Sequence, residues 1–209
     1  FAGHALVMGL EYCGDRLTSD RFVNHKMTSR TLEETEFYVQ DDWMVNDHWM
    51  FSGGVRTNFS EAFGFMYMPK IAAKYSPDDH WAIRANYSMG YRSPSIKELF
   101  FNWDHLGMFM IKGNEFLKPE KNNYVSAGVE YSNRHFFFNS TLYGNFYRKK
   151  IEGVWRIYDM QYNFEYVNLD RQTIAGVDLL GRWTPTDWLT LNASYSYVYV
   201  SKEKGLRIN

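Results

Sequence analysis

The stretch Trp188-Leu189-Thr190-Leu191-Asn192-Ala193-Ser194-Tyr195-Ser196-Tyr197-Val198-Tyr199-Val200 alternates apolar and polar side chains, and this alternation decides the fold class. Leucine, alanine and tyrosine fill the odd positions from Leu189 to Tyr199, whereas threonine, asparagine and serine fill the even positions from Thr190 to Ser196. Successive side chains of a β-strand point to opposite faces, so the stretch predicts a strand with one apolar and one polar face.

Nine segments of the chain show this pattern, and they are longer than ordinary strands. We expect strands at 4–13, 32–44, 49–60, 66–76, 81–91, 122–132, 136–149, 164–184 and 188–200. A strand that crosses an outer membrane as part of a barrel needs about nine to eleven residues, apolar toward lipid and polar toward the lumen. Strands of soluble proteins average about five to six residues. The lengths therefore predict an all-β, antiparallel transmembrane barrel wall of nine meandering strands.

The connections between these segments alternate between short and long. Four short ones, rich in Asn, Asp and Pro, lie at 45–48, 77–80, 133–135 and 185–187. Longer ones lie at 14–31, 92–121 and 150–163, although the connection at 61–65 is short. Bacterial outer-membrane barrels have short periplasmic turns and long extracellular loops. We therefore place the short turns at the periplasmic end, where a girdle of aromatic rings would lie beside them: Trp43, Trp49, Trp81, Phe136, Trp183 and Trp188.

Composition excludes several other classes of protein. Aromatic residues make up 19% of the 209 residues, yet the mean hydropathy is −0.47, as expected for a barrel with a polar lumen. No apolar run exceeds four residues, so the sequence predicts no transmembrane helix. The net charge of −1 gives no electrostatic basis for binding nucleic acid. The single cysteine, Cys13, permits no internal disulfide.

Neither end of the sequence has the signals of a complete outer-membrane protein. The chain starts without an initiator Met or a signal peptide, and the tail 201–209 has the composition of a loop before a further strand. We expect the sequence to be a fragment of a longer protein.

Seven short motifs resemble, in order and spacing, the barrel domain of TonB-dependent outer-membrane receptors. They are Tyr38–Trp43, Phe51–Arg56, Pro69–Pro77, Gly90–Phe100, Gly113–Lys121, Tyr166–Asn168 and Gly176–Asp178. The resemblance implies that residues 1–209 form part of a barrel of about 22 strands, with the N-terminal plug and the C-terminal strands missing. It also implies a place in the outer membrane of a Gram-negative bacterium, in contact with outer-membrane lipid, and coupling to the energy-transducing protein TonB through the plug.

Receptors of this family import scarce ligands, so the resemblance implies transport and not catalysis. Their ligands are haem, ferric siderophores, cobalamin or oligosaccharides, and glycan importers often work with a surface lipoprotein. A barrel enzyme such as a lipase or protease is a competing hypothesis, but the sequence has no serine, histidine and acid pattern for it. A soluble all-β binding module is a third, and it predicts shorter strands.

The loop 92–121 favours haem among these ligands. Haem receptors of the family carry two boxes with a histidine between them, and here Tyr91-Arg92-Ser93-Pro94 and Asn114-Glu115-Phe116-Leu117 correspond to the boxes. His105 lies between them, and a neutral imidazole is a good axial ligand for haem iron. We expect haem only as cargo, with no intrinsic cofactor. Apolar side chains near His105 could cover a porphyrin face: Phe100, Phe101, Trp103, Met108, Phe109 and Met110.

Two other readings of these residues stay open. A single loop histidine is often solvated or bonded to a neighbour, and looser forms of both boxes occur in siderophore and cobalamin receptors, where they shape the end of a strand.

Two charged motifs outside this loop give no evidence of a site. Asp41 and Asp42 are adjacent on a strand and point to opposite faces, so they cannot act as a carboxylate pair. Arg148-Lys149-Lys150 lies at the outer end of a strand, where it would face water or lipopolysaccharide phosphates.

Overall fold

The computed structural model describes residues 3–22, 26–158 and 160–201, which form eleven strands and one short helix. The elements are β1 (His4–Ser19), β2 (Thr28–Met44), β3 (Trp49–Ser60), β4 (Gly64–Tyr75), β5 (Trp81–Arg92), α1 (Ile96–Phe100), β6 (Asn102–His105), β7 (Phe109–Lys112), β8 (Glu120–Ser132), β9 (Phe136–Tyr158), β10 (Gln161–Thr186) and β11 (Leu189–Val200). Among the described residues, no helix is long and apolar enough to cross a membrane.

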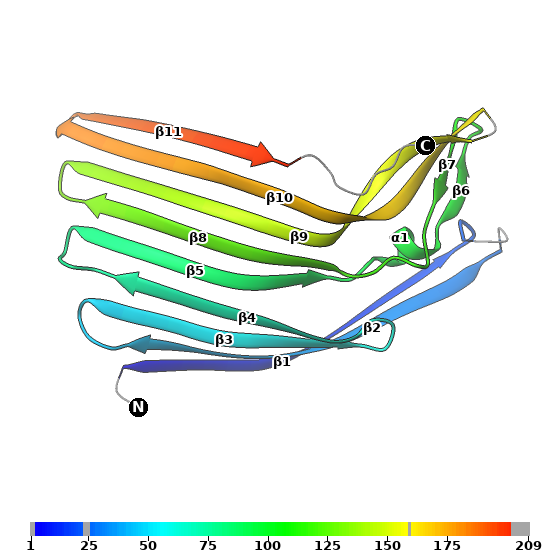
Figure 1. Ribbon diagram of the computed structural model, residues 1–209, viewed down its shortest axis with the longest axis horizontal. Coiled ribbons are helices and arrows are strands. Elements are labelled where there is room, and N and C mark those ends of the chain that lie inside the picture. The colour runs from blue at the N-terminus through cyan, green and yellow to red at the C-terminus, as the bar shows by residue number, and fades with distance from the viewer. Residues whose placement is uncertain (1–2, 23–25, 159, 202–209) are drawn as a thin grey trace.

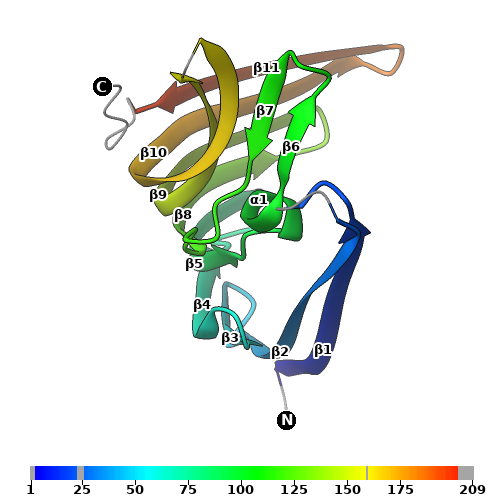
Figure 2. The same ribbon diagram turned by 90° about the vertical axis from the view of Figure 1, so that its right-hand side faces the viewer.

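Nine of the strands form a curved antiparallel wall, in the order β1-β2-β3-β4-β5-β8-β9-β10-β11 (Figure 1). Neighbours in the sequence are neighbours in the sheet, except where the segment between β5 and β8 is inserted. One edge of β10 pairs with β9, while its other edge pairs with β11 toward the short turns and, in parallel, with β7 at the opposite end. Viewed from that end, the wall is an arc, and α1 lies on its concave side (Figure 2). The predicted all-β wall and its nine long strands are confirmed.

Two of the expected loops are instead continuous strands. β1 and β2 stay paired as far as Ser19 and Thr28, so most of the connection expected at 14–31 is a ribbon. β9 and β10 likewise stay paired to Tyr158 and Gln161, through the loop expected at 150–163. These extensions project beyond the β3–β4 turn, where neither face meets lipid. Their side chains therefore need no strict alternation, which is the signal on which the sequence prediction relied.

The third expected loop, 92–121, contains α1 and the hairpin β6–β7. The hairpin was missed because its two strands have only four residues each, shorter than the period-two pattern requires to be distinct.

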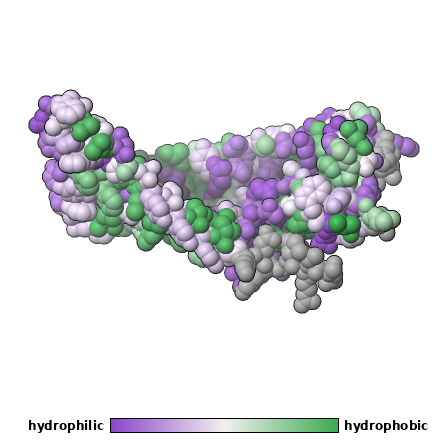
Figure 3. Space-filling model, turned by 90° about the horizontal axis from the view of Figure 1, so that it is seen from above, coloured by the Kyte–Doolittle hydropathy of each residue, from purple (hydrophilic) through white to green (hydrophobic). Residues whose placement is uncertain are grey.

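One face of the wall is apolar and exposed. Many outward side chains are large, apolar and exposed: Leu6, Met8, Leu10, Phe37, Phe59, Phe65, Tyr67, Ile71, Ile83, Leu142, Phe146, Tyr195 and Tyr197. Apolar residues gather along the convex margin of the molecule in Figure 3. The opposite face holds a hollow of about 520 Å³, lined largely by polar and small residues such as Lys70, Arg84 and Asn86. This is the pattern of a barrel wall with lipid outside and a polar lumen inside.

Asp41 and Asp42 confirm that alternate side chains separate onto the two faces. Asp41 Oδ2 lies 2.7 Å from Nδ1 of His4, whose ring stacks on Trp43. Asp42 instead accepts a hydrogen bond from Gln40 at 3.0 Å. As predicted, the two carboxylates do not form a pair.

Three of the short turns share one construction, an Asn or Asp followed two residues later by histidine. The Asn or Asp oxygen accepts two following backbone N–H groups at 2.7–3.0 Å; these residues are Asn46, Asp78 and Asn133. Each histidine Nδ1–H then donates to a backbone carbonyl of the next hairpin at 2.8–3.1 Å: His48 to Ser76, His80 to Ser132, and His135 to Thr184. The acceptor residues donate their own N–H groups back to the histidine carbonyls at 2.7–2.8 Å. Reciprocal bonds thus join four consecutive turns at this end of the wall.

Candidate ligand-binding site

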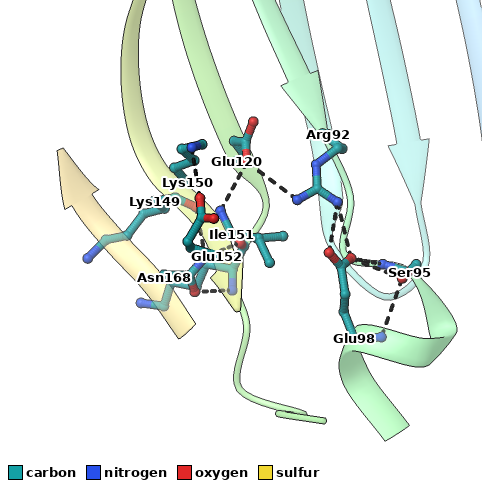
Figure 4. A network of polar contacts seen from close by, with 10 residues as sticks. Arg92, Ser95, Glu98, Glu120, Lys149, Lys150, Ile151, Glu152 and Asn168 are labelled. Atoms are coloured by element: carbon teal, nitrogen blue, oxygen red, sulfur yellow. Dashed lines mark hydrogen bonds and ion pairs between the residues drawn. The ribbon is translucent and has the colours of Figure 1, made fainter. Parts of the chain in front are cut away.

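The segment after β5 is held by a capping box and an arginine bridge. The Ser95 hydroxyl accepts the N–H of Glu98 at 3.3 Å, and the Glu98 carboxylate accepts the N–H of Ser95 at 2.7 Å. Arg92 lies between two carboxylates, 3.1 Å from Glu98 and 3.4 Å from Glu120 (Figure 4). Glu120 also accepts the N–H of Ile151 at 3.0 Å. Arg92 therefore ties the start of α1 to β8, and Glu120 ties β8 to β9.

The other residues of the first box are also held within the fold. The Ser93 hydroxyl donates to Glu34 of β2, and Pro94 is fully buried. The Tyr91 hydroxyl is buried and has no hydrogen-bond partner among the described residues. The box connects the end of β5 to β2 across the concave side.

The second box closes the same segment from the other side. The Asn114 side chain donates to the carbonyl of Tyr166 at 3.1 Å and accepts the N–H of Phe116 at 3.0 Å. Its backbone N–H donates to the carbonyl of Glu98 at 2.8 Å, which brings the two boxes together at α1. Leu117 packs with Leu99 and Ile151 in a small core, whereas Glu115 is exposed and Phe116 is 90% exposed.

His105 lies at the tip of the β6–β7 hairpin, away from the boxes at its base. It pairs with Phe109 in the last register position, while Asn102 and Lys112 form the first. Its ring lies 4.8 Å from Trp103 and 4.8 Å from Phe109, and its Nδ1 is buried without a hydrogen-bond partner among the described residues. In the structure the two boxes therefore contact each other, whereas His105 contacts the aromatic rings of Trp103 and Phe109.

The rings around His105 continue onto the extensions of β9 and β10. Phe109 meets Trp155 edge to face at 5.1 Å, Trp155 meets Phe164 at 5.1 Å, and Phe164 meets Tyr166 at 5.3 Å. We call Trp103, His105, Phe109, Trp155, Phe164 and Tyr166 the aromatic cluster. Partial burial, and then the nearby carboxylate of Glu98, raise the pKa of the Tyr166 hydroxyl above its usual value.

Two cations lie over aromatic rings at this end of the wall, one over a ring of the aromatic cluster and one over Tyr158, at the end of β9. The Arg21 guanidinium, at the end of the β1–β2 ribbon, lies 4.1 Å from the centre of the Trp103 ring. The Lys112 ammonium lies 5.7 Å from the ring centre of Tyr158, which has an exposed fraction of 41%. Three segments at the end of the wall opposite the short turns, β1–β2, β6–β7 and β9–β10, therefore contribute these aromatic and cationic groups.

Sequence reasoning found only part of this surface. Of the apolar residues expected near His105, Trp103 and Phe109 contact it, but Phe100 packs against the small core and Phe101 against Phe22. Trp155 was missed because its segment, 150–163, was expected to be a loop, and Phe164 was expected only as the first residue of the strand at 164–184. The high density of aromatic residues from Trp155 to Tyr166 is the sequence feature that could have indicated these rings. No group of three metal-ligating side chains occurs in the part of the chain that the structure describes.

Comparison with known proteins agrees with this architecture. The model of the family described as "TonB dependent receptor-like, beta-barrel" matches residues 2–209. The iron-regulated outer membrane virulence protein of Vibrio cholerae is 23% identical over 97% of this chain and 33% of its own length. The vitamin B12 transporter BtuB of Photobacterium profundum is 26% identical over 95% of this chain and 30% of its own length. The chain spans about a third of the length of these curated relatives.

Among solved structures, the siderophore receptor PirA from Pseudomonas aeruginosa superimposes with a TM-score of 0.85. It is 17% identical, and the match covers 95% of this chain and 40% of PirA. This likeness supports the fold of the wall, including the strands that continue beyond the β3–β4 turn. The proteins of this family are transporters of the Gram-negative outer membrane and not enzymes. Since the family model matches almost every residue, the chain belongs to the TonB-dependent receptor-like β-barrel family.

Proposed function

We propose that the complete receptor imports an aromatic, anionic ferric siderophore across the outer membrane, using energy delivered through TonB. The observation that carries the proposal is the aromatic cluster with its flanking cations at the extracellular end of the wall. The names of the iron-regulated relative and of PirA agree with iron uptake.

The chemistry of the surface suits such a chelate. Aromatic pairs stabilise contacts by about 0.5–1.5 kcal/mol beyond the burial of their area. A cation over a ring adds about 0.5–1 kcal/mol at exposed sites and more where water is excluded. A ferric complex with catechol-type arms offers flat rings for Trp155 and Phe109 and negative charge for Arg21 and Lys112.

Haem is a second candidate, and His105 is the observation that favours it. A porphyrin is also flat and aromatic, and it carries two carboxylates. Because Nδ1 of His105 is buried between Trp103 and Phe109, only Nε2 could act as an axial ligand without rearrangement. The sequence argument for haem placed two boxes around His105. In the structure, however, the boxes contact each other at α1, so they lend no direct support to an iron ligand at the hairpin tip.

A titration of the complete receptor in detergent separates the candidates. A ferric tris-catecholate and haemin are each titrated against the wild type, Trp155→Ala and His105→Ala, with cobalamin as a third ligand. Phe116→Ala is the matched control, since Phe116 is an exposed ring outside the aromatic cluster. We expect saturable tris-catecholate binding that is about tenfold weaker in Trp155→Ala, from the loss of one or two ring contacts, and unchanged in Phe116→Ala.

Saturable haemin binding that is lost in His105→Ala, without tris-catecholate binding, would instead establish haem as the ligand. Cobalamin binding alone would contradict both proposals. Coupling to TonB is tested by growth on the bound chelate as the only iron source, in strains with and without TonB. Growth that is equal in the two strains would contradict active import.

A further inference from the structure

Two carboxylates and two buried polar side chains face each other on the inner face of the wall, beside the β3–β4 turn. Glu36 of β2 pairs with Asn58 of β3. Two residues further along each strand, Glu34 pairs with Ser60. Asn58 is 0% exposed and Ser60 is 1% exposed, whereas Phe59 between them points outward. Glu34, Glu36, Asn58 and Ser60 therefore form one polar group on the luminal side, which we call the Glu34 cluster.

Two oxygen atoms of the Glu34 cluster are buried without a partner. Oδ1 of Asn58 and Oγ of Ser60 are shielded from water, and neither has a hydrogen-bond partner within residues 3–22, 26–158 and 160–201. Buried oxygens in folded proteins are almost always bonded, so two orphaned oxygens side by side on one strand indicate a group that is not part of the chain, such as an ion or a water molecule.

The negative charge of the cluster is only partly compensated. The Arg56 guanidinium lies 2.7 Å from Oε2 of Glu36, which leaves the other carboxylate oxygen, Oε1, beside Asn58. Glu34 accepts hydrogen bonds from the Asn58 amide and from the Ser93 hydroxyl. In the part of the chain that the structure describes, however, Glu34 forms no ion pair. The Glu34 carboxylate is therefore half-buried without a cation.

The cluster has the spacing of ligands around a single ion. Nδ2 of Asn58 lies 3.1 Å from Oε2 of Glu34 and 3.1 Å from Oε1 of Glu36. A side-chain amide keeps its shape when it turns by half a revolution, so Oδ1 can take the position of Nδ2, and a cation between the carboxylates would favour that orientation. Oxygens that surround calcium at about 2.3–2.6 Å lie about 3 Å from their neighbours in the shell.

We propose that the Glu34 cluster binds a calcium ion. Its ligands are the carboxylates of Glu34 and Glu36, the amide oxygen of Asn58 and the hydroxyl of Ser60. Calcium binds hard oxygen ligands in a flexible shell, whereas magnesium retains several waters, for which two buried ligands leave little room. Only two of the ligands are acids, so the site differs from a group of three His, Cys, Asp or Glu side chains, which the described residues lack.

The bound ion would connect three parts of the wall. It joins β2 to β3, and Ser93, which contacts Glu34, continues the connection to the first box and α1. Calcium sites in extracellular modules have dissociation constants of about 10⁻⁴–10⁻³ M, and we expect a value in this range. The site is distinct from the aromatic cluster, so the inference does not rest on the identity of the imported ligand.

The test uses the complete receptor in detergent, stripped of metal with EGTA, and radioactive calcium alone as the probe. Equilibrium dialysis counts the ions bound by the wild type, by Glu34→Gln/Asn58→Leu and by the milder variant Ser60→Ala. The control is Glu130→Gln, because Glu130 is an inner-face acid that pairs with Arg84 at 3.0 Å, near the short turns. Gel mobility with and without heating shows that each variant is folded.

We expect the wild type and Glu130→Gln to bind the same number of calcium ions, and Glu34→Gln/Asn58→Leu to bind one ion fewer. Ser60→Ala should bind that ion about tenfold more weakly, as the disruption of a metal shell does. Calcium should also slow hydrogen exchange of residues 56–62 in the wild type. Equal numbers of ions in the wild type and the folded double variant would overturn the proposal, because the orphaned oxygens would then hold only water. Displacement of that ion by an equimolar amount of magnesium would overturn the assignment to calcium.

Discussion

Arg92 shows how a residue that resembles part of a ligand site can instead hold a loop. In the sequence, Arg92 belongs to the box Tyr91-Arg92-Ser93-Pro94 and lies 22 residues before Asn114 of the second box. Both features are consistent with a role in ligand binding. The partners of Arg92 lie 6 and 28 residues away, and nothing in the spacing indicates that Glu98 and Glu120 would meet it. Spacing along the chain predicts which residues belong to a loop, but not which of them contact each other once the loop folds.

Replacing Arg92 should therefore destabilise the loop 92–121. Glu98 and Glu120 have side-chain exposures of 15% and 14%, so Arg92→Ala leaves two shielded carboxylates without their cation. We expect the free energy of unfolding to fall by about 1–3 kcal/mol, the cost of a buried polar group without its partner. Thermal unfolding of the complete receptor in detergent measures the loss, and limited proteolysis locates it. Arg134→Ala is the control, and equal stability of the two variants would show that the bridge contributes nothing.

The extensions of β9 and β10 mark the limit of prediction at the level of elements. Alternation identifies a strand wherever one face meets lipid and the other the lumen, and the nine wall segments were found for that reason. Beyond the membrane this requirement ends, and the ribbon from Val154 to Glu165 is stabilised by its own ladder and by the aromatic rings between it and β7. Long-range ring contacts of this kind leave no periodic trace in the sequence, so the aromatic cluster could be predicted only in part.

Gly153 is the point at which this ribbon is most sensitive to an added side chain. A Cβ at Gly153 would overlap the ring of Phe164, which is packed between Trp155 and Tyr166. Gly153→Ala should displace that ring and lower the local stability by about 1–3 kcal/mol, as overpacking does. Hydrogen exchange of residues 151–166 in the complete receptor should become faster. The control is Gly181→Ala, because a Cβ added at Gly181 meets nothing within 4 Å. In this control, hydrogen exchange of residues 151–166 should stay as in the wild type. Identical exchange of residues 151–166 in both variants would contradict the packing described for Phe164.

The whole wall is organised by its two environments. Outward side chains such as Leu142, 59% exposed, have no protein neighbour to cover them, whereas inward ones such as Thr141 line the polar hollow. This division follows from the alternation alone, which is why the fold class was predictable. The depth of each residue in the membrane follows from its distance along the strand from the aromatic girdle.

Leu142 and Thr141 test the two faces with one substitution at adjacent positions. Leu142 lies six residues from both Phe136 and Arg148, near the middle of the bilayer. Leu142→Arg should destabilise the folded receptor by about 2–4 kcal/mol, the cost of arginine on the lipid face at the bilayer midplane. Thr141→Arg should cost much less, since it faces the lumen beside Asp178. Reversible unfolding by denaturant in lipid vesicles gives both values. A larger loss for Thr141→Arg would reverse the assignment of the faces.

The reciprocal bonds between the short turns have a consequence for how such a wall could change in size. The two inner hairpins, β4–β5 and β8–β9, each form one pair of hydrogen bonds with the following hairpin and one pair with the preceding hairpin. A duplicated hairpin inserted into the series would meet the same donors and acceptors on both sides, so no backbone group would lose its partner. The circumference could then grow by gene duplication, two strands at a time, without new chemistry at the junctions.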